Sequence, residues 1–250
     1  MISEPDYSYV GSGHILVREY GSAAPFLSVG NCSALSFSPQ STSIQLTDFT
    51  SPGGGQRNRV DRVTGVDYSF TVHDLHGENL ARFLRGTSTA VVAGTATAEQ
   101  LVAYKGGWTP FGKYAATITS VKGVGGTPTY VAGTDYELDN GGIFIPSTST
   151  IANPVSGAAN CQVDYTFAAH TLTEALVSSA KQYTLIFVGL NEARSGSPVR
   201  VTAHKISGGV LANMGLLGED YASGEVSGAL LSDTSKGAGL SKYFSVLMVA

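Results

Sequence analysis

The pattern of apolar and polar residues is clearest between Asp61 and Gly86. Apolar side chains take one face of a predicted strand and polar side chains the other: Val66, Tyr68, Phe70 and Val72 against Asp67, Ser69, Thr71 and His73. This period of two is typical of a half-buried strand. The sheet that contains it is therefore expected to have one solvated face.

The strand leads into a short predicted helix. Leu80, Phe83 and Leu84 lie at helical spacing and form one apolar stripe, which we expect to pack on the sheet. Gly86 is expected to provide a left-handed C-cap. Asp74 or a neighbouring polar residue would cap the helix N-terminus. Glu78 would lie in the first turn, where the helix dipole favours an acidic side chain.

Alternating and apolar runs predict further strands at 14–19, 27–37, 42–49, 57–72, 183–189, 199–206 and 243–249. The runs at 183–188 and 243–249 are apolar on both faces, which indicates a place inside a sandwich or at a subunit junction. The alternation changes phase between Val60 and Val66, which predicts a β-bulge.

A very polar segment separates two of these strands. It comprises Ser51, Pro52, Gly53, Gly54, Gly55, Gln56, Arg57, Asn58 and Arg59. Ile44 and Leu46 alternate on the strand before it. We expect this segment to be the tip of a long hairpin, and an ordinary mobile loop is the alternative.

Residues 114–167 are expected to form a small inserted β unit, and residues 1–113 and 168–250 the main β domain. Within the insertion, Asp139–Gly142 predicts a hairpin turn with positive φ angles before Ile143–Ile145. Residues 161–167 read as an alternating strand. Thr171–Ser179 is either a brief helix or the chain returning to the main sheet.

The composition limits the function classes. Only 14% of the 250 residues are charged, so the surface is either covered by copies of the chain or rich in Ser and Thr. The net charge of −4 and the absence of basic clusters argue against binding to a nucleic-acid backbone.

No apolar run is long enough for a membrane helix, and residues 1–6 lack signal-peptide features, so a cytoplasmic protein is expected. Cys32 and Cys161 are expected to be reduced, buried thiols.

Few residues suggest catalysis or cofactor binding. His73, Asp74, His76 and Glu78 could ligate a metal, but capping of the predicted helix explains them more simply. Gly53–Gly55 lacks the Lys-Ser/Thr pair of a phosphate loop. Trp108 is expected to anchor a loop rather than to form a ligand platform. We therefore expect no metal, no cofactor and no enzymatic activity.

The order of these features resembles the major tail tube proteins of long-tailed, siphovirus-type bacteriophages. It comprises Val29–Asn31, Leu46–Phe49 entering the Gly-rich tip, the long strand into Asp74–Ala81 and Phe83–Gly86, the insertion, and Phe187–Asn191. The resemblance covers most of the chain. It implies a mainly β fold: a tail-tube-type β-sandwich or half-barrel with one flanking helix, a long hairpin loop and an inserted unit on the outer surface.

The resemblance further implies a structural virion protein, assembled in the host cytoplasm and located in the virion tail. Its hexameric rings would stack through the 51–59 tip into a tube for DNA ejection. Arg57 and Arg59 would pair with acids of the next ring, and Asp48, Asp61 and Asp67 would face the lumen. Its partners would be further copies, the tape measure, terminator and distal tail proteins, and passing DNA that is not specifically bound.

Two other classes remain open. A related ring-forming protein, such as a tail terminator, a distal tail component or a secretion-system tube, would share the strands. A carbohydrate-binding or hydrolytic β-sandwich would need an exposed aromatic platform or paired acids in a cleft, and the 12 tyrosines are compatible with it.

Overall fold

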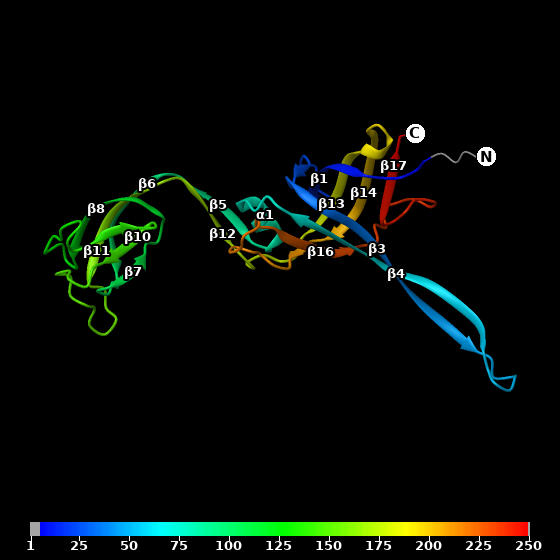
Figure 1. Ribbon diagram of the computed structural model, residues 1–250, viewed down its shortest axis with the longest axis horizontal. Coiled ribbons are helices and arrows are strands. Elements are labelled where there is room, and N and C mark those ends of the chain that lie inside the picture. The colour runs from blue at the N-terminus through cyan, green and yellow to red at the C-terminus, as the bar shows by residue number, and fades with distance from the viewer. Residues whose placement is uncertain (1–5, 250) are drawn as a thin grey trace. The chain divides into compact units, whose positions relative to one another are not determined.

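The computed structural model describes residues 6–249, and the chain is mainly β (Figure 1). It forms two compact units, the first comprising residues 1–88 and 173–250 and the second residues 89–172. The expectation about a signal peptide rests on a segment whose first five residues lie outside the described part. No helix within residues 6–249 is long and apolar enough to cross a membrane.

The first unit is built on one sheet of nine strands. The path through it is β2-β1-β13-β14-β16-β4-β3, with β17 also on β14 and β15 also on β16. The strands are β1 (Gly11–Glu19), β2 (Leu27–Ser28), β3 (Cys32–Thr47), β4 (Gln56–Val72), β13 (Gln182–Asn191), β14 (Ser197–Ser207), β15 (Val210–Leu211), β16 (Gly224–Leu230) and β17 (Phe244–Met248). A short 3₁₀ helix, Glu192–Arg194, joins β13 to β14.

The sheet has two halves that share one core. The halves are joined by a single residue pair, Ile206 of β14 with Leu230 of β16. Both halves contribute to the same cluster of buried side chains: Ile15, Val17, Leu185 and Ala203 from one, and Val66, Tyr68, Phe70, Val72 and Val226 from the other. The rings of Phe37 on β3 and Phe244 on β17 stack at 5.4 Å, so the two halves also meet at this point.

Strands β3 and β4 form a long antiparallel hairpin. The predicted strands 27–37 and 42–49 are divided differently in the structure. The strand conformation is interrupted around Gly30, and β3 then continues without interruption through Pro39 to Thr47. Proline is tolerated there because β3 is an edge strand and needs no donor on its outer side. The predicted bulge is confirmed: the register shifts where Gln40 and Ser41 face Gly65 and Val63, which leaves Thr64 as the extra residue.

The predicted helix is confirmed as α1 (Gly77–Phe83). Phe83 is buried and packs edge-on against Phe70 at 5.8 Å, and Leu80 and Leu84 pack on the same core. The N-terminal cap is a polar neighbour of Asp74, which is one of the two predicted possibilities. His76 accepts the hydrogen bond from Asn79 N–H, and the Asp74 carboxylate accepts one from Asn31 N–H.

At the other end of α1, Arg85 rather than Gly86 adopts the left-handed conformation, with φ 50°. Glycine is needed at position 86 for a different reason, because a Cβ there would lie 2.1 Å from the carbonyl oxygen of Glu174.

The second unit is a small sandwich of two three-stranded sheets. One has the order β7-β10-β9 and the other β6-β11-β8. The strands are β6 (Gly94–Leu101), β7 (Gly107–Pro110), β8 (Ala115–Gly123), β9 (Glu137–Asp139), β10 (Gly142–Ile145) and β11 (Cys161–Phe167). The predicted turn is confirmed, since Asn140 and Gly141 between β9 and β10 have φ angles of 44° and 72°.

The inserted unit is larger than the predicted 114–167. Strands β6 and β7 belong to it, because β6 pairs with β11 and β7 pairs with β10. The chain enters through β5 (Thr87–Val91) and leaves through β12 (His170–Glu174), which pair as a two-stranded sheet. Residues 171–179 contain no helix, so this segment is the returning chain.

Both cysteines are free thiols, Cys161 buried and Cys32 half-buried. Burial raises the pKa of each thiol to about 11. The thiolate fraction at neutral pH is therefore very small, and neither cysteine is a good nucleophile.

Asp233 is a buried acid of the first unit whose hydrogen bonds suggest a test of the fold. Its carboxylate accepts bonds from Ser235 Oγ at 2.7 Å, Tyr20 Oη at 2.8 Å and Ser235 N–H at 3.0 Å. These bonds, led by that of the Ser235 side chain, lower the pKa of Asp233 from 3.8 to about 2. The ionised form therefore stabilises the folded state fully above pH 3.8, and this contribution is lost as the pH falls toward 2.

We expect Asp233→Asn to lower the free energy of unfolding at neutral pH by about 1–3 kcal/mol, because bonds to a charged acceptor are lost. The difference from the wild type should shrink as the pH falls below 4. Urea titrations followed by circular dichroism would measure both effects. Asp67→Asn, a change at an exposed acid of the same unit, is the control. Equal stability of Asp233→Asn and wild type at neutral pH would contradict the expectation.

Candidate assembly surface

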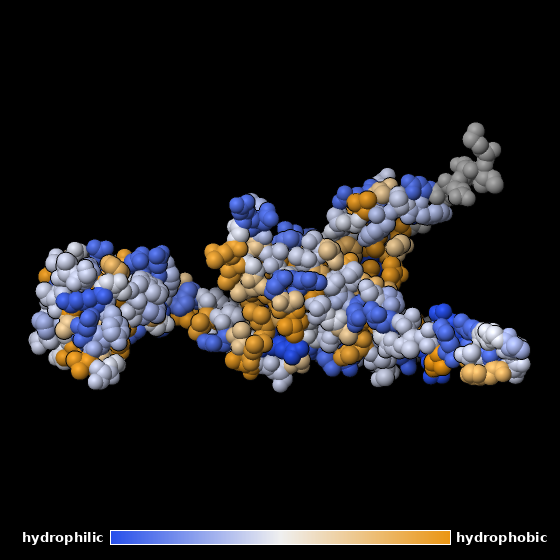
Figure 2. Space-filling model, turned by 60° about the horizontal axis from the view of Figure 1, so that its bottom comes forward, coloured by the Kyte–Doolittle hydropathy of each residue, from blue (hydrophilic) through white to orange (hydrophobic). Residues whose placement is uncertain are grey.

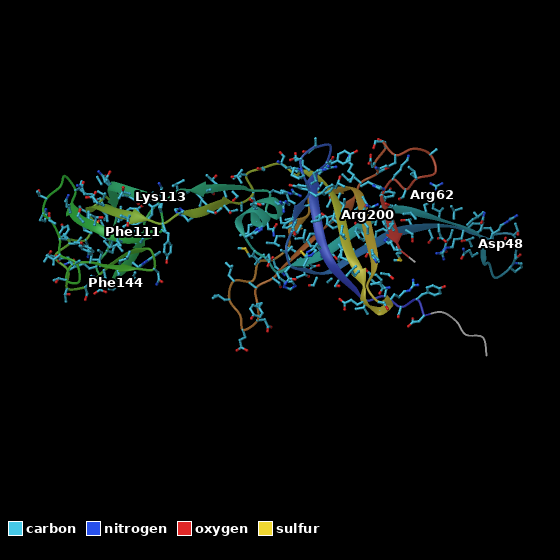
Figure 3. All side chains as sticks on the ribbon, turned by 90° about the horizontal axis from the view of Figure 1, so that it is seen from above. Asp48, Arg62, Phe111, Lys113, Phe144 and Arg200 are labelled. Carbon is cyan, nitrogen blue, oxygen red and sulfur yellow. The ribbon has the colours of Figure 1, made fainter. Side chains whose placement is uncertain are left out.

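The distal part of the β3–β4 hairpin is the most exposed regular structure of the first unit. We call residues 41–64 the distal hairpin. All of them are exposed except the half-buried Asp48. Figure 1 shows that the hairpin projects beyond the other strands of this unit, and Figure 3 places Asp48 near its far end and Arg62 closer to the sheet.

The bulge places Val60 of β4 on the same face of the distal hairpin as Ile44 and Leu46 of β3. Ile44 lies directly opposite Val60, and residues directly opposite share a face. Leu46, two residues further along β3, lies on the same face and directly opposite Asn58. Because Thr64 is an extra residue, Val60 faces away from the side on which Val66 is buried.

We call Ile44, Leu46 and Val60 the apolar strip. Their exposed fractions are 54%, 53% and 47%. Arg62, opposite Thr42, lies on the same face. Figure 2 shows hydrophobic and hydrophilic residues close together along this projecting segment. The strip has the composition of a contact surface rather than of a solvated hairpin.

A two-stranded ribbon is marginally stable in water when nothing packs on it. The distal hairpin also has two free edges within the described part of the chain, since beyond Val66 its strands are paired there only with each other. Two separate compact units of these sizes would together expose about 12,500 Å², whereas the chain exposes 15258 Å². The excess is consistent with a ribbon whose packing partner lies outside the chain.

The hairpin tip is held by its own hydrogen bonds. Asp48 N–H donates to the carbonyl of Gly55, and the Asp48 carboxylate accepts from Thr50 Oγ1 at 2.6 Å and Thr50 N–H at 2.8 Å. These Thr50 bonds lower the pKa of Asp48 below its ordinary value. Gly53 and Gly54 take φ angles of 98° and 65°, which few other residues adopt, so the tip is a defined turn.

The predicted stacking arginines differ in their surroundings. Arg59 Nε lies 2.8 Å from Asp61 Oδ1, so the nearest acid is on its own strand. Both side chains are at least half exposed, and such a surface pair contributes little. Arg57 and Arg62 form no ion pair within residues 6–249. They are therefore better placed than Arg59 to meet acids of another molecule.

The three predicted lumen acids do not share one face. Asp61 lies on the face opposite the apolar strip, with Arg59. Asp67 lies opposite Ser38 and next to Ala229, on the solvated face of the sheet. Asp48 is at the tip. The bulge between Asp61 and Asp67 separates them, so a single lining surface would receive only part of this set.

The predicted metal alternative is not assembled by the fold. His73 is bonded to Ser33 Oγ through Nε2, His76 caps α1, and Asp74 accepts from Asn31 N–H. Glu78 lies in the first turn of α1, as expected. Within the described residues, no group of three or more His, Cys, Asp or Glu side chains is placed to hold a metal ion.

A groove of about 440 Å³ opens between β3 and the strands β1, β14 and β17. Its apolar lining includes Ile15, Leu35, Phe37, Phe187, Val246 and Met248. Among the described residues that line it, the only titratable side chains are those of Tyr9 and Cys32. The groove is suited to apolar packing. The both-face-apolar strand β17 forms one of its walls and is itself largely exposed, with Met248 at 63%.

A second exposed apolar segment was not singled out from the sequence. Residues 213–223, between β15 and β16, form no regular structure and include Leu216, Leu217 and Tyr221. Leu217 and Tyr221 are 99% and 98% exposed. The segment also carries Glu219 and Asp220. Its only signal in the sequence is an apolar cluster without strand or helix periodicity.

Trp108 is a strand residue rather than a loop anchor. It lies on β7 opposite Phe144 of β10, is 48% exposed, and donates its indole N–H to the carbonyl of Asp139 at 2.8 Å. Its ring lies over Gly142, where a Cβ would be 2.7 Å from it. The second unit therefore presents an aromatic pair on the outer face of this sheet.

Comparisons with known proteins place the chain in a family without indicating an activity. A family model with the description "Protein of unknown function UCP028589" matches residues 8–247. A search of curated proteins finds no match. Since the matched segment spans nearly the whole sequence, the chain belongs to this family, described as a protein of unknown function.

Proposed function

We propose that the protein is a structural virion component, a tail tube protein whose hexameric rings stack into the conduit for DNA ejection. The observation that carries the proposal is the distal hairpin. It is a long ribbon with an apolar strip, free edges and a defined tip, all beyond the core of its own unit. Such a ribbon is suited to packing against further copies of the chain.

Closure of several copies into a ring would remove the exposed edges. Hairpins that pair side by side into a continuous barrel leave no free strand edge, which protects against disordered aggregation. The low fraction of charged residues, 14%, leaves few charged side chains to protect these edges in a monomer. The shared core of the first unit, the flanking helix and the hairpin support a tail-tube-type half-barrel.

The charge balance supports passage of DNA without binding. Each copy contributes a net charge of −4, and a ring multiplies this value. Acids that face a narrow bore repel phosphates, and this repulsion is screened only beyond about 10 Å at moderate salt. The tape measure, terminator and distal tail proteins would be the other partners. In this role the chain needs neither cofactor nor catalytic group.

Negative-stain microscopy of the purified protein tests the proposal directly. We expect rings of about six subunits, or tubes, that become more abundant with concentration, because assembly follows mass action. Replacing residues 51–59 by a two-residue turn should leave folded subunits that form no long tubes. Wild-type protein that stays monomeric at high concentration would contradict the proposal, and normal tubes from the shortened variant would exclude the stacking role of the tip.

The apolar strip allows a test that separates folding from assembly. We expect Ile44→Ser with Leu46→Ser to change the free energy of unfolding of the subunit by no more than about 0.5 kcal/mol, because both side chains are exposed. The same variant should lose assembly in sedimentation velocity runs. Ser43→Thr with Gln45→Thr, on the opposite face of β3, is the matched control. Full assembly of the Ile44/Leu46 variant would show that the strip is not a contact surface.

A further inference from the structure

We propose that the distal hairpin of one copy docks on residues 213–223 of the next copy. We call residues 213–223 the acidic loop. The inference rests on the proposed self-assembly and deepens it, because it names the surface that receives the hairpin. Four observations support it: the exposure of the acidic loop, the match of the two apolar surfaces, the match of their charges, and their places at opposite ends of β4.

The acidic loop presents large apolar side chains that no described residue of the first unit covers. Leu217 and Tyr221 are almost fully exposed, and Leu216 is 74% exposed. Isolated exposed apolar residues are ordinary, but several large ones within one short segment indicate a contact surface. Tyrosine and leucine also provide the apolar area that the buried centre of an interface requires.

The charges of the two segments are opposite in sign. Glu219 and Asp220 are exposed and form no ion pair within residues 6–249. On the hairpin, Asp61 is paired with Arg59 and Asp48 is bonded to Thr50. Arg62 forms no ion pair with any described residue and lies on the same face as the apolar strip. Each segment thus combines an apolar surface with charge that the other complements.

The two segments lie at opposite ends of strand β4. The acidic loop is followed by Gly224 of β16, which pairs with Val72 at the C-terminal end of β4, whereas the hairpin tip precedes the N-terminal end of β4 at Gln56. At a rise of about 3.3 Å per residue, the stretch from Val60 to Val72 spans about 40 Å. Figures 1 and 3 both show the orange chain before β16 far from the hairpin tip.

This separation determines the kind of contact. The two surfaces of one chain cannot meet each other, so each requires a different copy. A heterologous contact of this kind repeats head to tail, and it produces an open stack when the repeat does not close into a ring. The spacing of successive rings would then be about 40 Å, or less where the strand is tilted from the axis.

The groove beside β3 is the competing receptor for the hairpin. It is apolar, but no Asp or Glu lines it, so it offers nothing to Arg62. A hairpin seated there would place an arginine against an uncharged wall. The acidic loop provides both the apolar and the charged complement, and we therefore favour it.

A charge exchange tests the inference. Arg62→Glu, and separately Glu219→Arg with Asp220→Arg, should each raise the protein concentration at half-assembly by about tenfold or more, because like charges would face each other. The variant that carries all three changes should restore assembly toward the wild-type concentration. Sedimentation velocity would measure the association, and microscopy would measure the ring spacing.

Lys105→Glu, an equal charge change on the exposed surface of the second unit, is the control and should leave assembly unchanged. If the wild type forms tubes and the charge variants assemble equally well, the acidic loop is not the receptor, while the proposed function stands. Failure of the triple variant to recover, with both partial variants impaired and all three folded, would also overturn the pairing. A wild type that never assembles would overturn both proposals.

Discussion

The pairing of β3 with β4 continues well beyond the core that supports it, so the distal hairpin has no packing layer from the described part of its own unit. At its base the hairpin is held by a buried cluster that includes Tyr68 and Phe70, and by the β16 strand alongside. Beyond Val66 the backbone groups of the outer edges have no strand partner among residues 6–249. A ribbon of this kind gains its stability from whatever packs on it, and in the proposed assembly that partner is another copy of the chain.

The bulge at Thr64 determines on which face of the distal hairpin Val60 lies. One extra residue exchanges the faces of β4, so that Val66 points into the core while Val60 lies on the other side with Ile44. Without the bulge, Val60 would continue the core face of the sheet, whereas Ile44 and Leu46 on β3 would stay on the other face. With it, all three form a separate surface that is accessible to another copy. A local irregularity in pairing thus separates the surface used for folding from the surface proposed for assembly.

Much of this architecture is readable from the sequence, and the rest depends on long-range pairing. The period-two run ending at Val72, the phase change before Val66, the stripe on α1 and the Asn140-Gly141 turn are local signals, and all four are confirmed. The extent of the inserted unit was misjudged because β6 belongs to it only through its pairing with β11, which lies far along the chain.

The candidate site was only partly predictable for the same reason. The hairpin and its tip follow from local turn chemistry and alternation. Which acids share a face depends on the exact position of the bulge, and the acidic loop has no periodicity that would reveal it. Gly86 was assigned to a cap, whereas its role is to allow the close approach of the Glu174 carbonyl, a contact that a sequence pattern does not encode.

Hydrogen–deuterium exchange of residues 41–64 in dilute and assembled protein tests the central claim most directly. If the distal hairpin is completed by another copy, its amides should exchange rapidly in the monomer and become strongly protected on assembly, while the amides of β13 and β14 are protected in both states. Protection of residues 41–64 already present in the monomer, or rapid exchange that persists in the assembled protein, would contradict the account.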